Sequence, residues 1–334
     1  MPDSSPIWNL NDLYVGMDDS ALAADLAAAR QDAVTLAANW QGKLATATGA
    51  ELASVIAEYE RIFESLGKVH SHAQLLFAAN TIDAAIAKHH QSVREAGAEI
   101  NATLLFVELE TAVMDDSHVT DLMKTPECAY WKPWLRRVRA MAPHQLSADM
   151  ERMLAERAPA GRGAWVRLFD ETAAALKFAF QGAEVTEAEI LDKLSSPDAG
   201  IRKEAGLSLS ATLKANDRLL SLILNTIAKD KEVEDRWRGF ARPVASRNLA
   251  NDVDDEVVDA LVSAVNSRNA DLSHRYYAMK AGWMGVDRLD WWDRNAPLPG
   301  DDDRQFSWPE AEQIVLDAFT GFDPEMAATA KLFF

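Results

Sequence analysis

Histidine is the side chain best suited to hold a metal or move a proton near neutral pH, and this chain has seven of them. A helical zinc site typically places two histidines four residues apart with a glutamate between them. His70 and His72 are two apart and His89 and His90 are adjacent, so neither pair shares a helical face. The other three stand alone: His118, His144 and His274. With no HExxH present, we interpret all seven as surface or partly buried residues and predict no metal ligand.

A cluster of carboxylates resembles half of a calcium-binding loop. It comprises Asp252, Asp254, Asp255 and Glu256. Such a loop needs a glycine at its sixth position, where Val257 stands, and a distal glutamate at its twelfth. We therefore interpret the four acids as charge at the start of a helix, where the helix dipole favours it.

Three further features could support catalysis or nucleotide binding, and none is convincing. Glu108 and Glu110 are two apart, so they point to different faces of a helix and make no acid–base pair. Cys128 has no histidine nearby in sequence, which favours a structural thiol over a nucleophile. Gly161-Arg162-Gly163 resembles only a loop with two glycines, and no phosphate-binding glycine motif occurs. We predict no catalytic residue in this chain, and its substrate-binding residues stay unknown.

Aromatic residues gather near Tyr276-Tyr277, at Trp283, Trp291, Trp292 and Trp308. Such a density of rings can line a peptide groove or can simply pack in a core. The sequence leaves both interpretations open.

Composition excludes several classes of partner. The 34 basic and 52 acidic residues give a net charge of −18, so nucleic acid and anionic membranes would be repelled. No run of 18 apolar residues and no signal peptide is visible, so we expect no membrane span. The single cysteine excludes an internal disulfide and favours a cytoplasmic location.

The centre of the chain, from Leu219 to Val265, is predicted to be a helical hairpin around the loop RGFARPVASRN. Gly239 can end the first arm, and Pro243 prevents its immediate return. Each arm carries an apolar stripe at helical spacing. The stripes are Leu219, Leu220, Ile223, Leu224 and Ile227, then Val257, Val258, Leu261, Val262 and Val265.

The remaining pattern is typical of a mainly α, multi-helix lobe. Helices are predicted over 18–42, 51–67, 68–80 and 83–113, and another begins at Ser147. Alternating apolar residues and Gln181-Gly182 predict one short β-hairpin near 175–185. Further helix starts are predicted at Thr186, at Ser196-Pro197, at Ser307 and at Asp323-Pro324.

Both ends of the chain carry large apolar residues that we expect to be buried against other parts of a protein. Trp8, Leu10, Leu13 and Tyr14 should fix an extended arm to the helical body. The last predicted helix runs into Leu332, Phe333 and Phe334 with no capping glycine and no polar tail. We therefore expect the chain to be cut inside a larger protein.

Several stretches of this sequence together resemble oligoendopeptidase F and its relatives among the thimet-type zinc oligopeptidases. They are the arm 8–14, Gly161–Asp170, Leu224–Lys231, Ser246–Asn248, Tyr276-Tyr277 with Lys280, and Trp292–Leu298. The resemblance spans the whole chain and implies a helical lobe lining one wall of a channel that admits short peptides.

The resemblance also implies zinc held by an HExxH helix and a later glutamate, none of which this chain contains. It therefore resembles an N-terminal portion lacking the HExxH segment. We expect an N-terminal helical lobe over 1–182, then the start of a metallopeptidase catalytic domain over 183–334. The implied function is oligopeptide hydrolysis jointly with a missing C-terminal catalytic half, with no zinc bound and no activity in this chain alone. The alternative is a stand-alone, non-catalytic helical peptide-binding protein.

Overall fold

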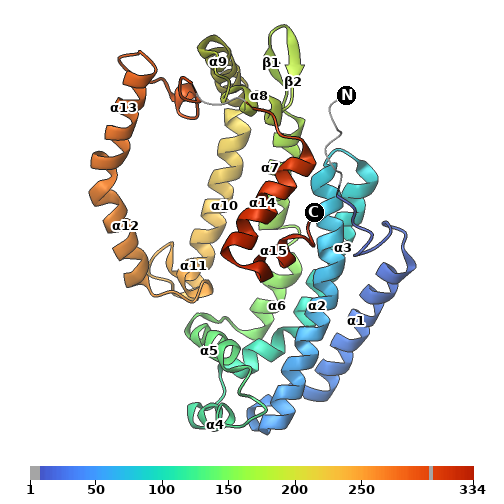
Figure 1. The fold of residues 1–334 in the computed structure, drawn as a ribbon. Coiled ribbons are helices and arrows are strands. Elements are labelled where there is room, and N and C mark those ends of the chain that lie inside the picture. The colour runs from blue at the N-terminus through green and yellow to red at the C-terminus, as the bar shows by residue number, and fades with distance from the viewer. Residues whose placement is uncertain (1–7, 301–303) are drawn as a thin grey trace.

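The computed structural model describes residues 8–300 and 304–334, and most of them are helical (Figure 1). The two strands are β1 (Phe178–Phe180) and β2 (Ala183–Val185). The helices before them are α1 (Ser20–Trp40), η1 (Leu44–Thr46), α2 (Gly49–Ala79), α3 (Ala84–Ala112), α4 (Asp116–Leu122), α5 (Lys132–Ala140), η2 (Ala142–His144), α6 (Ala148–Arg157) and α7 (Arg162–Ala175). Those after them are α8 (Glu187–Lys193), α9 (Ala199–Ala215), α10 (Asp217–Arg238), α11 (Ala245–Ala250), α12 (Asp255–Asn269), η3 (Ala270–His274), α13 (Arg275–Trp283), η4 (Trp291–Asp293), α14 (Trp308–Phe322) and α15 (Pro324–Ala330).

The main core lies between α1, α2 and α3. Thr48 and Glu51 form a capping box that starts α2. The predicted helix over 51–67 is confirmed as part of α2, and its residues Leu52 and Ile62 are fully buried. The segments 51–67 and 68–80, expected as separate helices, are one continuous helix. It ends at Asn80, and Asp83 caps the returning helix α3.

A smaller core surrounds the predicted β-hairpin, which the structure confirms. Phe178 pairs with Val185 and Phe180 with Ala183 in antiparallel register. Gln181 and Gly182 have φ of 50° and 80°, the left-handed pair that a tight hairpin turn requires. Buried rings of the hairpin then pack against α8 and α9.

Two local expectations are wrong. Ser196-Pro197 does not start a helix, because Asp198 is the N-cap of α9 and its carboxylate accepts from the amides of Gly200 and Ile201. Near the N-terminus, Tyr14 is buried beside Leu22 and Val69, as expected of the arm. Trp8, expected to anchor the same arm, is exposed. Residues 1–7 of the arm lie outside the described residues, as does the loop 301–303.

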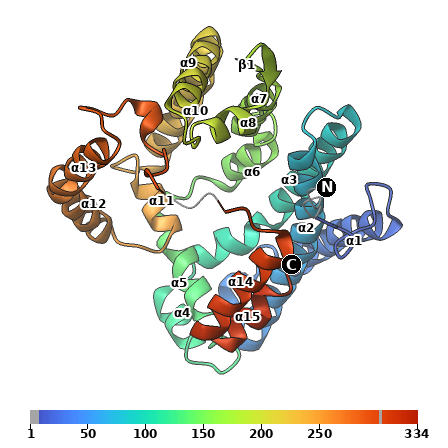
Figure 2. The same ribbon diagram turned by 45° about the horizontal axis from the view of Figure 1, so that its top comes forward.

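The predicted central hairpin is only partly confirmed. Gly239, with φ of 74°, ends α10 as expected, but the loop contains an additional helix, α11. The acids at 254–256 do lie at the start of α12, with Asp254 as its N-cap. The two arms diverge, since both views show α12 and α13 apart from α10 (Figures 1 and 2). Consequently Ile223 of the first stripe is buried, whereas the stripe of α12 is largely exposed.

The last two helices start as predicted. The Glu310 carboxylate accepts from the Ser307 amide at the start of α14, and Asp323 accepts from the Glu325 amide at the start of α15. The helix α15 ends at Ala330, which leaves Leu332 and Phe333 exposed. Within the described parts of the chain, no helix is long and apolar enough to cross a membrane.

Candidate functional site

A cavity of about 520 Å³ lies where α3, α6, α10 and α11 meet. Its apolar lining comes from Leu105, Leu109, Met141, Phe240 and Ala250. The polar lining comes from Glu108, Gln145, Glu151, Arg162, Asp230, Lys231, Glu234, Asp235, Arg238, Ser246 and Arg247. An apolar base with several convergent polar groups is typical of a small-molecule site. Two stretches on which the family resemblance rests, Leu224–Lys231 and Ser246–Asn248, meet at this cavity.

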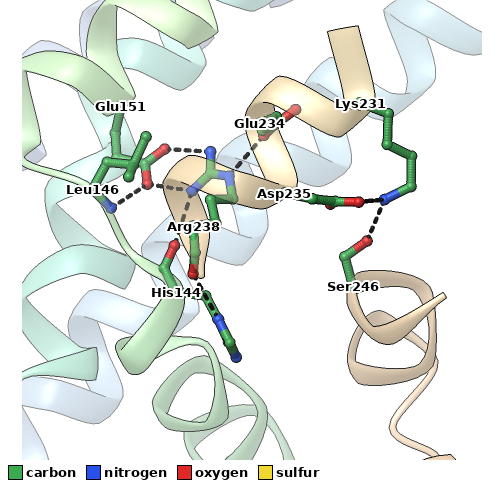
Figure 3. A network of polar contacts seen from close by, with 8 residues as sticks. All are labelled: His144, Leu146, Glu151, Lys231, Glu234, Asp235, Arg238 and Ser246. Atoms are coloured by element: carbon green, nitrogen blue, oxygen red, sulfur yellow. Dashed lines mark hydrogen bonds and ion pairs between the residues drawn. The ribbon is translucent and has the colours of Figure 1, made fainter. Parts of the chain in front are cut away.

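Arg238 fixes the end of α10 against α6 (Figure 3). Its guanidinium donates to both carboxylate oxygens of Glu151, at 2.6 and 2.9 Å, and to Glu234 at 2.7 Å. It also donates to the main-chain carbonyl of His144 at 3.2 Å. A bidentate, largely buried guanidinium–carboxylate pair restricts both partners strongly. This wall of the cavity is therefore preorganised.

His144 strengthens the same junction. Its Nδ1 donates to the carbonyl of Arg238 at 2.8 Å, and its ring stacks on Phe240 with centroids 3.9 Å apart. The left-handed Gly239 directs the chain so that Phe240 reaches this position. The sequence treated His144 as isolated, and its partners come from a helix far along the chain.

Lys231 connects α10 to α11 on the other side of the cavity (Figure 3). Its ammonium donates to both oxygens of Asp235, at 2.8 and 2.7 Å, and to the hydroxyl of Ser246 at 2.8 Å. The i,i+4 spacing of Lys231 and Asp235 follows from the helix itself. Ser246, the first residue of the Ser-Arg-Asn stretch, thus has a structural role.

The Glu151 carboxylate remains charged despite its position. Burial disfavours its charge, but the hydrogen bonds from Arg238 and from the Leu146 amide outweigh burial and lower the pKa of Glu151. The same hydrogen bond from Arg238 to Glu151 raises the pKa of Arg238. Both groups stay ionised over the physiological range and cannot exchange protons readily. The pair supports structure and not acid–base catalysis.

Three charged side chains at the cavity have no hydrogen-bond or ion-pair partner among the described residues. They are Arg162 on α7, Arg247 on α11 and Asp230 on α10. Two free guanidiniums and one free carboxylate suit a ligand that carries both charges, such as a peptide with free ends. Among the lining residues there is no cysteine, and the sole hydroxyl, that of Ser246, accepts from Lys231. The arrangement can bind a zwitterion, but it provides no activated nucleophile.

The structure pairs the four histidines of α2 and α3 across the two helices. His72 and His90 are buried, so their interpretation as surface or partly buried residues is wrong. His70 lies 6.3 Å from His90 and His72 lies 6.4 Å from His89, measured between ring centroids across α2 and α3. Neighbours on one helix do point to different faces, but the antiparallel return of α3 brings the histidines of the two helices together. Nevertheless, the described residues contain no group of three or more metal-ligating side chains that could hold a metal ion.

The other candidate residues have structural partners. Glu110 accepts from the amides of Gly42 and Leu44, whereas Glu108 accepts from the Tyr59 hydroxyl, so the two carboxylates do face different neighbours. Cys128 is fully buried in the main core, and its thiol donates to the Gly49 carbonyl at 3.3 Å.

The aromatic residues do not form one groove. Tyr277 and Trp291 line a separate cavity of about 640 Å³, but Trp283 and Trp308 do not line it. Trp292 packs on α9, where a Cβ on Gly206 would lie 3.0 Å from its Cβ. Trp308 contacts Phe334 near the end of the chain.

The stretch Trp292–Leu298 is held by two buried cations. Arg202, 2 % exposed, pairs with Asp293 at 2.9 Å and donates to the carbonyls of Ser196 and Pro197. Lys280 donates to the carbonyls of Arg294 and Ala296 at 2.8 and 2.6 Å. These positions therefore stabilise the fold, which sequence reasoning did not recognise.

Comparison with known proteins agrees with the resemblance. A family model described as Oligopeptidase F matches residues 110–178, from the end of α3 to β1. The group B oligopeptidase PepB of Streptococcus agalactiae is 24 % identical over 256 residues, which cover 74 % of this chain and 42 % of that protein. The oligopeptidase PepF of Bacillus subtilis is 22 % identical over 99 % of this chain and 50 % of its own length. The chain is thus similar in sequence to oligopeptidases of this type.

The fold of this chain agrees with that similarity. The crystal structure of oligoendopeptidase-F from Enterococcus faecium matches it with a TM-score of 0.76 and 16 % identity, over 93 % of this chain and 65 % of that one. The mainly helical fold class is thus confirmed. The chain spans about half the length of the curated relatives it matches.

Proposed function

We propose that this chain is the N-terminal portion of a zinc metalloendopeptidase that hydrolyses oligopeptides in an enclosed channel. The observation that carries the proposal is the similarity, along nearly the whole chain, to a protein named as an oligopeptidase. The helical fold shared with oligoendopeptidase-F supports it. We also propose a cytoplasmic location, which the single cysteine favours.

Zinc chemistry in this proposal belongs to another part of the enzyme. The described residues do not fit a zinc ion, because they contain no group of three metal-ligating side chains. We therefore assign this chain to substrate enclosure and binding and derive no hydrolytic step from its own residues. We predict that residues 1–182 form a helical lobe and that residues 183–334 form the start of a catalytic domain.

The test is a peptidase assay on the full chain with an internally quenched oligopeptide and added zinc. We expect no cleavage by the chain alone, and cleavage that a chelator stops once a zinc-bearing half of an oligopeptidase is supplied. Chelator-sensitive hydrolysis by the isolated chain would contradict the division of roles.

A second candidate function is that of a stand-alone, non-catalytic peptide-binding protein. The unpaired Arg162, Arg247 and Asp230 at the cavity favour it. Calorimetric titration with one short peptide, bearing either a free or an amidated C-terminus, measures this directly. If the arginines bind the carboxylate, Arg247→Gln weakens binding of the free form about tenfold, or about 1.4 kcal/mol. Equal affinity for the free and amidated peptides, unchanged by Arg247→Gln, would exclude this role for the cavity.

A further inference from the structure

The helices α12, η3 and α13 follow one another without a break and carry an uncovered apolar face. We call this face the outer stripe. Its side chains are between 44 % and 64 % exposed. They are Val257, Leu261, Val265, Leu272, Tyr276, Met279 and Trp283. Exposed apolar patches of this extent usually mark interaction surfaces.

The spacing of the outer stripe indicates what shape of partner it fits. Its residues follow one another at intervals of four, four, seven, four, three and four. Intervals of three and four keep side chains on one side of a helix and let a second helix pack against them. The π-helical turn η3 contains Leu272 of the stripe, and π-helical turns are frequent at functional sites. The surface is therefore suited to an amphipathic helix.

The other elements of the molecule leave this face open. Figure 2 places α12 and α13 at one side of the molecule and α1 at the other. Near its start, Asp255 and Asp259 are bound by Arg242, so these acids fix α12 to the α10–α11 loop. No residue of α12 is buried, which is unusual for a helix with such a stripe.

The net charge of this chain and the length of its relatives indicate which partner binds the outer stripe. Two copies of a chain with net charge −18 repel each other, so a second copy is a poor occupant. The relatives are about twice as long as the part this chain matches, so they contain a half that has no counterpart here. We propose that the outer stripe is the docking surface for that half, which contacts it through an apolar helix face. The half can be continuous with this chain or separate. This inference rests on the proposed function and assigns its partner surface.

The test uses the full chain and, as the probe, the half of the Bacillus subtilis PepF that does not match it, purified separately. Association is measured by analytical ultracentrifugation with no peptide present. We expect a one-to-one complex with the wild-type chain, and at least tenfold weaker binding by Leu261→Glu and by Leu272→Glu. Val34→Glu is the matched control, because Val34 is 51 % exposed and lies on α1. It should bind like wild type.

Three outcomes would overturn the proposal. These are the absence of a complex with the wild-type chain, equal binding by the stripe and control variants, and a dimer of the chain alone that Leu261→Glu dissociates. Circular dichroism confirms that each variant is folded. Peptide hydrolysis is measured separately on the same complex. A complex that forms through the stripe but cleaves nothing would contradict the proposed function and support the docking surface.

Discussion

The four histidines of α2 and α3 show how individual residues depend on long-range pairing. Nδ1 of His72 and Nε2 of His89 and of His90 are buried and have no hydrogen-bond partner among the described residues. Desolvation favours the neutral form of an imidazole, so acid should disturb this part of the core. His90 is the strongest case, since its ring also stacks on Phe77 with centroids 4.7 Å apart.

Stability should therefore fall in mild acid because of His90. Burial, aided by the positive charge of Arg94, lowers its pKa from 6.5 to about 4. The unfolded chain takes up a proton below pH 6.5 that the folded protein resists until about pH 4, so the free energy of unfolding decreases between these values. Urea unfolding over this range should show a shallower pH dependence for His90→Gln than for wild type. His274→Gln, at an exposed position, is the control, and equal slopes for both variants would refute the assignment.

At the scale of elements, buried cations connect segments that are distant in sequence. Arg202 attaches α9 to η4 through Asp293, and Arg238 attaches α10 to α6 through Glu151. Removing one member of a buried pair leaves the other charge without compensation. Breaking such a pair should therefore destabilise the fold more than breaking a surface pair does.

Arg202→Leu should lower the free energy of unfolding by about 3–5 kcal/mol, since it leaves the largely buried Asp293 without its ion-pair partner. Arg30→Leu removes an exposed pair with Glu99 and should cost less than about 1 kcal/mol. Both are measured by urea unfolding at one pH. The double variant Arg202→Leu/Asp293→Asn should cost less than the sum of its single changes. Similar losses of unfolding free energy in Arg202→Leu and Arg30→Leu would show that the buried pair matters no more for stability than the surface pair.

Sequence patterns predicted the elements better than their contacts. Thr186 and Ser307 start helices as expected, because a capping box depends on residues only three apart. The divergence of α10 from α12 was not predictable, since an apolar stripe does not indicate which surface covers it. The Arg238–Glu151 pair joins residues 87 apart, and no local pattern indicates such a contact.

At the scale of the whole molecule, charge opposes the association of exposed apolar faces. The net charge of −18 keeps copies of the chain apart, although the outer stripe and the residues after α15 are uncovered. That balance depends on pH, because carboxylates supply the repulsion.

Self-association of the isolated chain should rise as the pH approaches its isoelectric point of about 4.8. Protonation of carboxylates removes the repulsion while the apolar outer stripe stays exposed. Static light scattering during an acid titration should increase, and less so for Leu261→Glu than for Val34→Glu. Identical curves for the two variants would show that the stripe is not the surface responsible.

Because Cys128 is buried, the rate at which a thiol reagent labels it reports how often the main core opens. A thiol reagent meets no other cysteine in the chain, and this one is closed off between the Gly49 carbonyl and the main core. The reagent can reach Cys128 only while the core is transiently open. The labelling rate of Cys128, divided by the labelling rate of an unprotected thiol, therefore measures the fraction of time for which the core is open. The measurement needs no denaturant. It would compare directly the opening of this core in the isolated chain with its opening when the chain is bound to a partner.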